Sequence, residues 1–224
     1  TLTQQEQQNL ENGVSTNWVD RVVEQGFQQS HQLSVRGGNE TTQFAISGGY
    51  FQERGAIKKQ GYDRTSLRVN LDHTVADRFR VGTSMQLSNR VQDWGPNPYG
   101  GAIATNPLAR AYNEDGSLNL RPGADPLIYN PLADLRDEAY IDERQRLRVF
   151  GSVFAELDIL ENLNYRVDVA PDIKEYRRGV FQSTQTTARN GTSPYGEKEE
   201  ERQYTYTFEN VLTYSDQFAD IHSL

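Results

Sequence analysis

The chain lacks cysteine, long hydrophobic runs and much apolar sequence of any kind. Without cysteine among its 224 residues, disulfides, thiolate metal sites and cysteine nucleophiles are excluded. Hydrophobic residues make up 35% of the chain and the mean hydropathy is -0.78, so a large buried core is not expected. No apolar stretch approaches the roughly 18 residues that a membrane helix needs. Membrane-crossing strands stay compatible with this composition, because they present lipid only at every second side chain.

Charge and sequence signals exclude several further classes of protein. The formal charge of -8 and the pI near 5.0 argue against a nucleic-acid partner, which would require a concentrated basic face. Residues 1–5 (TLTQQ) have no initiator Met, basic region or apolar segment, so we expect no signal peptide and a piece of a longer chain. The three histidines, His31, His73 and His222, are far apart in the sequence. We therefore expect no catalytic residues, no metal site, no cofactor and no enzyme activity.

The first 30 residues predict two short helices. Thr3 and Glu6 have the spacing of a capping box, and Gly13 would close the helix that they open. A second apolar stripe then ends near Gly26 and consists of Trp18, Val19, Val22 and Val23. We expect residues 1–30 to form an extracellular connector with short helices, and a frayed connector is the alternative.

From residue 31 to 224 the sequence alternates between apolar and polar residues wherever it is not a loop. This period of two predicts half-buried strands with one apolar and one polar face, several of them long enough for a tilted membrane crossing. Pro171 and Asn210 interrupt the pattern, and each is expected to mark a bulge or the end of pairing. The residues expected to face lipid, on the convex side, are Val69, Leu71, Val81, Met85, Val149, Val153, Val167 and Phe208.

The connections between these strands alternate between short and long. Such alternation is typical of outer-membrane barrels, whereas a soluble sandwich has no reason to maintain it. The prediction is an all-β protein: an antiparallel up-and-down meander of about eight strands, with its first and last strands unpaired to each other. Short connections are expected at 37–40, 75–77, 160–162 and 215–217, and long ones at 54–61, 92–142 and 174–200.

Two sets of residues are candidates for function. Arginines on the polar strand faces would line a lumen with Asp72, Glu156, Asp158 and Asp168, either pairing with other charges or simply meeting water. The long loop over 92–142 carries aromatic residues suited to stacking on sugar or peptide, or to packing against a lid or the loop itself. The arginines are Arg68, Arg80, Arg90, Arg146, Arg148 and Arg166, and the aromatic residues are Trp94, Tyr99, Tyr112, Tyr129 and Tyr140.

Several short segments, taken in order, resemble the SusC/RagA-like family of TonB-dependent outer-membrane transporters. No single one is highly specific, but together they extend over nearly the whole chain. They are residues 17–20 (NWVD), 31–38 (HQLSVRGG), 48–51 (GGYF), 55–57 (GAI), 62–64 (YDR), 67–72 (LRVNLD), 106–109 (NPLA), 130–132 (NPL) and 206–210 (YTFEN).

The resemblance implies a plugged barrel of about 22 strands that imports oligosaccharides or peptides across the Gram-negative outer membrane. It also implies contact with outer-membrane lipid, a SusD-like surface lipoprotein as partner, and energy from TonB acting through a plug region. In this reading the lumen arginines would meet the plug. No plug, TonB box or carboxy-terminal closing strand is recognisable in the sequence, so we expect residues 31–224 to be part of a barrel. The alternative is a soluble all-β carbohydrate-binding or surface module.

Overall fold

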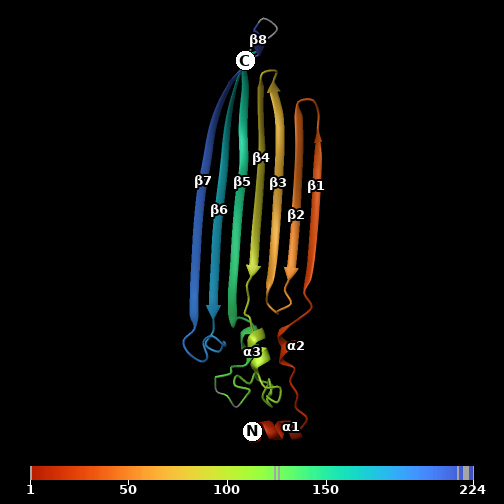
Figure 1. Ribbon diagram of the computed structural model, residues 1–224, viewed down its shortest axis with the longest axis vertical. Helices are drawn as coiled ribbons and strands as arrows, with labels where there is room; N and C mark the ends of the chain where they lie inside the picture. Colours follow the sequence, from red (N-terminus) through yellow and green to blue (C-terminus); the bar gives the residue numbers. More distant parts are fainter. Residues whose placement is uncertain (1, 124, 126, 216, 219–221, 224) are drawn as a thin grey trace.

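The computed structural model describes residues 2–123, 125, 127–215, 217–218 and 222–223, and it consists mainly of one antiparallel sheet (Figure 1). Its seven strands follow chain order, and within the described residues the edge strands β1 and β7 pair only with β2 and β6. The up-and-down meander is therefore confirmed. The strands are β1 (Phe27–Gly38), β2 (Thr42–Arg54), β3 (Gly61–Ala76), β4 (Phe79–Asp93), β5 (Tyr140–Leu160), β6 (Leu163–Gln182) and β7 (Tyr195–Tyr214).

The expectation of about eight strands in this sheet is wrong by one. Beyond β7, the two-residue strands β8 (Gln217–Phe218) and β9 (His222–Ser223) pair with each other rather than extend the sheet. Asp216, in the turn expected at 215–217, lies outside the described residues.

Short and long connections alternate as expected (Figure 1). Turns at 39–41, 77–78 and 161–162 lie at one end of the sheet, the turn end. Connections 55–60, 94–139 and 183–194 lie at the other, the loop end. The loops predicted over 92–142 and 174–200 were too long, because β5, β6 and β7 continue into them. Most residues on both faces are polar in those extensions, so the period-two signal disappears although backbone pairing persists.

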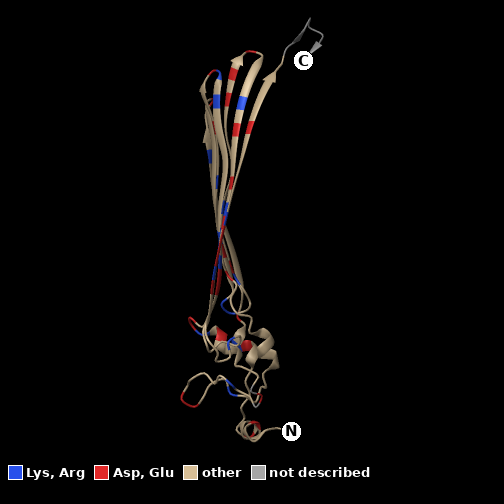
Figure 2. Cartoon of the chain, turned by 90° about the vertical axis from the view of Figure 1, so that its left-hand side faces the viewer, with Lys and Arg blue, Asp and Glu red and all other residues tan. Residues whose placement is uncertain are grey.

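The sheet is a single twisted layer, and no helix of the described residues covers either of its faces (Figure 2). Large apolar side chains are consequently exposed: Leu33 retains 75% of its accessible surface and Phe208 retains 65%. Extensive exposed apolar surface marks a protein or membrane contact. A closed two-sheet core, as a soluble sandwich would have, is absent from the described residues.

The apolar side chains form a band that stops before the loop end. On one face of β5 the band runs from Leu147 to Leu157, whereas Glu143 and Gln145 continue the same face toward the loops. A strand rises roughly 3.3 Å per residue, so the stretch from Leu147 to Leu157 covers about 25 Å along the membrane normal at a tilt of about 40°. That height matches the apolar band of an outer-membrane barrel.

The two interruptions of the alternation do not end pairing between β6 and β7. Pro171 lies opposite Tyr206 within the continuous β6–β7 ladder. Asn210 lies opposite Val167, and its side chain accepts a 2.6 Å hydrogen bond from the Tyr165 hydroxyl. A polar partner on the neighbouring strand, rather than a bulge, thus accommodates this amide on the apolar face.

Short helices gather at the loop end and hold the chain's small buried core. They are α1 (Gln4–Glu11), with the expected Thr3–Glu6 capping box, α2 (Trp18–Val22), α3 (Tyr99–Ala104) and the 3-10 helix η1 (Pro131–Leu135). None of the described helices is long and apolar enough to cross a membrane. β1 begins at Phe27, earlier than the strand expected from residue 31, because residues 28–31 are polar on both faces. The buried core comprises Trp18, Val22, Ala102, Ala109, Ala111 and Leu132.

Candidate functional site

All six arginines proposed for the lumen lie on one face of the sheet, hereafter the polar face. Strand register establishes this, because directly opposite residues point to the same side. Arg68 is opposite Gln86, Arg80 is opposite Glu156, and Arg148 is opposite Ser88. The remaining three, Arg90, Arg146 and Arg166, share the same parity along their strands.

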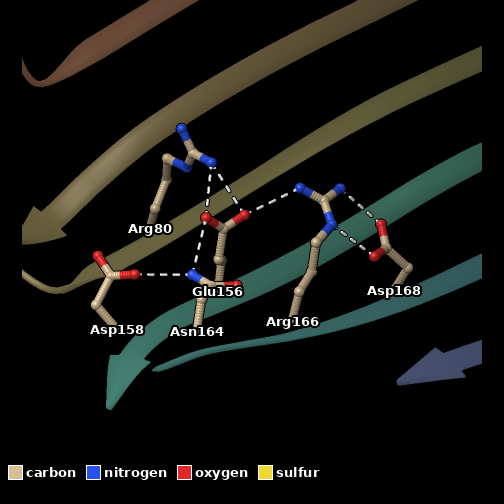
Figure 3. Close-up of polar contacts among 6 residues, drawn as sticks. All are labelled: Arg80, Glu156, Asp158, Asn164, Arg166 and Asp168. Atoms are coloured by element: carbon tan, nitrogen blue, oxygen red, sulfur yellow. Dashed lines mark hydrogen bonds and ion pairs between the residues drawn. The ribbon is translucent and has the colours of Figure 1, made fainter. Parts of the chain in front are cut away.

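Near the turn end, charged groups of the polar face form a closed network (Figure 3). Arg80 donates to both oxygens of Glu156 at 2.9 Å, and Arg166 donates to Glu156 at 3.1 Å. Arg166 also makes a bidentate contact with Asp168, at 2.7 and 2.8 Å. Asn164 donates to Glu156 at 3.2 Å and completes its shell of donors. Each cation in this network is thus matched by a carboxylate.

The register and one glycine explain why this network forms. Arg80, Glu156 and Arg166 lie directly opposite one another on β4, β5 and β6. Phe154 lies opposite Gly82, where an added Cβ would come within 2.4 Å of the aromatic ring. The Arg166 guanidinium stacks 4.0 Å from the centre of that ring. Because Gly82 has no side chain, the Phe154 ring has space there, and this ring orients the Arg166 guanidinium by stacking.

Further toward the loops, two other carboxylates pair with arginines. Asp172 accepts bidentate hydrogen bonds from Arg148 at 2.8 and 3.0 Å. Asp142, only 4% exposed, accepts from Arg144 and from Arg178. Sequence reasoning missed this second cluster, because Asp142 and Arg178 belong to strand ends that were assigned to loops.

Arg68, Arg90 and Arg146 are placed differently, since no ion pair with a carboxylate is found for them in the described part of the chain. Arg68 donates to the Gln86 side chain at 2.7 Å. Arg90 contacts the Ser88 hydroxyl at 3.5 Å, and Arg146 lies 5.1 Å from the centre of the Tyr176 ring. The six arginines therefore share a face but do not form one network.

The five candidate aromatic residues are not brought together at one site. Trp94, Tyr99 and Tyr112 are 49%, 42% and 46% exposed, whereas Tyr129 is 8% exposed and belongs to the packed interior of the loop. Tyr140 is the first residue of β5 rather than part of the loop, and it lines a pocket of about 380 Å³ with Asp142. Trp94 stacks 4.2 Å from the Arg144 guanidinium and is thereby tied to the polar face.

A buried carboxylate joins η1 to the loop over 183–194. Asp134 accepts hydrogen bonds from the Thr187 amide at 2.7 Å and from the Thr187 hydroxyl. Burial raises the pKa of the Asp134 carboxyl, although the hydrogen bonds from Thr187 act in the opposite direction. Among the described residues, no group of His, Asp or Glu side chains is arranged to hold a metal ion.

Comparison with known proteins identifies relatives at low identity over most of the chain. No family model matches it. The TonB-dependent receptors P3 and P26 of Formosa agariphila are 26% and 28% identical over 218 and 176 residues, or 92% and 77% of this chain. The TonB-dependent receptor SusC of Bacteroides thetaiotaomicron is 30% identical over 109 residues, 45% of this chain. The chain is a homologue of TonB-dependent receptors, SusC among them.

Comparison with solved structures confirms the fold. The structure of the RagAB peptide transporter aligns with a TM-score of 0.65 at 17% identity, covering 94% of this chain and 24% of that chain. The RagAB peptide importer in its closed-closed state gives a TM-score of 0.64, covering 91% and 24%. The chain spans about a fifth of the length of the TonB-dependent receptors P3 and P26, 21% and 17% respectively. Its sheet therefore shares the fold of about a quarter of that chain of the RagAB peptide transporter structure.

Proposed function

We propose that this chain is a wall segment of an outer-membrane active transporter that imports oligosaccharides or peptides. The homologues are named as receptors rather than enzymes, and their relationship supports nutrient import across the outer membrane. The observation that carries the proposal is the two-faced single layer. One face bears an apolar band about 25 Å high, and the opposite face bears the network around Glu156.

The proposed partners are TonB, acting through a plug region, and a SusD-like surface lipoprotein resting on the loop end. Exposed aromatic side chains at that end support a role in contact with the lipoprotein or with the imported solute. These are Trp94, Tyr99 and Tyr112. Residues 1–30 would then be an extracellular connector, because α1 and α2 lie at the same end as α3 and η1 (Figure 1).

Uptake by whole cells tests this function. Cells lacking the full-length protein should lose import of one labelled oligosaccharide or peptide pool, and re-expression should restore it. Deletion of TonB should abolish the same uptake. Equal uptake with and without TonB would contradict active transport, and extraction of the full-length protein without detergent would favour the soluble module.

The exposed aromatic residues permit a sharper test at the loop end. Tyr99→Ala with Tyr112→Ala should weaken binding of the proposed SusD-like lipoprotein, or uptake of the solute, without changing the yield of folded protein. Tyr112→Phe is the matched control, because it keeps the ring that the Arg21 guanidinium approaches at 5.7 Å. Unchanged binding and uptake in the double variant would remove these residues from the proposed site.

A further inference from the structure

Three arginines lie directly opposite one another across the polar face near the loop end. Arg64 on β3 is opposite Arg90 on β4, which is opposite Arg146 on β5. Side chains in such positions have their Cβ atoms about 4.5 to 5.5 Å apart. We call these three residues the arginine row.

No carboxylate neutralises the arginine row in the part of the chain that the structure describes. The neighbouring cation Arg148 is paired with Asp172, but among the described residues no ion pair involves any member of the row. The guanidinium groups contact aromatic rings instead: Arg64 lies 5.4 Å from the centre of the Phe51 ring, and Arg146 lies 5.1 Å from that of Tyr176. Like charges directly opposite in a sheet are destabilising, so this arrangement is unfavourable without an anion.

Space for a ligand lies on both sides of the row. On one side Gly49, Ser66 and Arg68 line a pocket of about 290 Å³ that also includes Arg64. On the other side a pocket of about 470 Å³ is lined by Arg90 and Arg146, together with Arg148, Lys174, Tyr176 and Glu201. The small residues next to the row leave the guanidinium groups accessible, and the larger pocket is of a size typical for small-molecule sites.

We propose that the arginine row binds a solute bearing carboxylate or sulfate groups, which deepens the proposed import function and rests on it. Planar guanidinium groups hold such anions by paired hydrogen bonds, and three in a row suit an oligomer with repeated anionic groups. Phe51 and Tyr176 lie at the two ends of the row and offer aromatic faces to the solute. Arg146 immediately precedes the apolar band at Leu147, so the row lies toward the loop end, where an external solute would arrive.

Binding to the purified full-length protein in detergent tests the row. The probes are trigalacturonate and a triglutamate peptide, with maltotriose and triglutamine as neutral counterparts, measured by calorimetry. The wild-type protein should bind an anionic probe more tightly than its neutral counterpart, and added salt should weaken that binding. Comparing the two anionic probes shows whether the solute is a sugar or a peptide.

Variants locate the site. Arg90→Gln with Arg146→Gln should weaken anion binding by about tenfold or more. Arg202→Gln is the matched control, because Arg202 lies opposite Glu175 on the other face of the sheet and should leave binding unchanged. Arg64→Gln alone serves as a second test if the double variant folds poorly, and it should also weaken binding.

Two results would overturn the proposal. One is that neither anionic probe binds the wild-type protein, which would happen if another acidic segment of the same protein covered the row. The other is that the wild type and the row variants bind the anionic probes equally well. The binding assay contains no TonB, so its result is independent of the proposed transport function. Anion binding without TonB-dependent uptake would contradict the proposed transport function. TonB-dependent uptake without anion binding would contradict only the proposal that the arginine row binds anions.

Discussion

The half of the sheet nearest the turns and the half nearest the loops differ on both of their faces. In the turn half the outer face is apolar, as at Val153, and the inner face carries the closed network centred on Glu156. In the loop half the outer face is charged, as at Glu143, and the inner face carries the arginine row. Strand pairing continues unbroken between β6 and β7 across both halves.

The difference follows from the medium on the outer face. Behind an apolar face that meets hydrocarbon, an unsatisfied charge is costly, so Arg80 and Arg166 pair with carboxylates and Arg68 donates to the Gln86 side chain. Where both faces meet water, solvent screens a charge, and an arginine without a carboxylate is tolerated. Arginines without a carboxylate are therefore best tolerated where water reaches both faces of the sheet.

The largest effect is expected from breaking the apolar face of the turn half. Val153→Arg should lower the free energy of unfolding of the full-length barrel by about 2 to 4 kcal/mol, because its side chain faces the middle of the bilayer. Ser152→Arg, on the polar face, should be tolerated. Folding titrations in lipid vesicles measure both values. Equal tolerance of the two substitutions would make the apolar band something other than a lipid-facing surface.

A somewhat smaller effect is expected at the centre of the closed network. Glu156→Gln should lower the free energy of unfolding by about 2 kcal/mol, because Arg80 and Arg166 lose their shared carboxylate. Glu143→Gln, on the outer face of the loop half, is the control and should change it by less than about 0.5 kcal/mol. Denaturant titration of each variant provides the comparison, and similar values for both would refute a structural role for the network.

Removing a charge from the arginine row should raise the free energy of unfolding, whereas Glu156→Gln lowers it. Replacing Arg90 by Gln relieves repulsion with Arg64 and Arg146, so the unliganded protein should become more stable by about 0.5 kcal/mol. The same titration measures it. Destabilisation as large as that caused by Glu156→Gln would show that the row is already neutralised, and the contrast between the two halves would fail.

The smallest effect concerns pH at the loop end. Because the folded-state pKa of Asp134 is raised, its contribution to stability is lost as pH rises from the ordinary value of 3.8 through the folded pKa. Wild type should therefore lose stability relative to Asp134→Asn over that interval. Asp115 gives a control of opposite sign: the Ser117 hydroxyl and amide lower its pKa, so its contribution is lost as pH falls. The measurement is the free energy of unfolding of the wild type and of variants lacking each carboxylate, taken at several pH values. If the contributions of Asp134 and Asp115 changed with pH in the same direction, this prediction would be contradicted.

Much of the fold could be predicted because strands with one apolar and one polar face show a clear alternation of residue types in the sequence. The alternation of Val149 and Val153 with Arg148 and Ser152 was sufficient to assign faces, and the lengths of the connections gave the meander. The loop-half extensions of β5, β6 and β7 could not be predicted. Most of their residues are polar on both faces, so no period of two appears, although backbone pairing and ion pairs such as Asp142–Arg178 maintain the strands there.

The candidate site was predictable as a face but not as a set of contacts. Sequence parity places Arg90 and Arg146 on the polar face, yet the long loop between them hides that they are opposite each other. Arg64 was recognised only as part of a family segment. Tyr129 could not be distinguished from Tyr99 and Tyr112 as a buried residue, because the loop follows no regular period and its packing depends on tertiary contacts.

Spin-label accessibility along β5 tests most directly the claim that the sheet has a lipid-facing turn half and a water-facing loop half. Residues 1–224 contain no cysteine, so single cysteines can be introduced one at a time from Ile141 to Leu157, in the full-length protein in bilayers after replacement of any cysteine outside this segment. From Leu147 to Leu157, collision with oxygen should peak at every second residue, in phase with Val149 and Val153. From Ile141 to Gln145, a water-soluble nickel reagent should reach both faces. A period of two over the whole strand, or no periodicity between Leu147 and Leu157, would contradict the account.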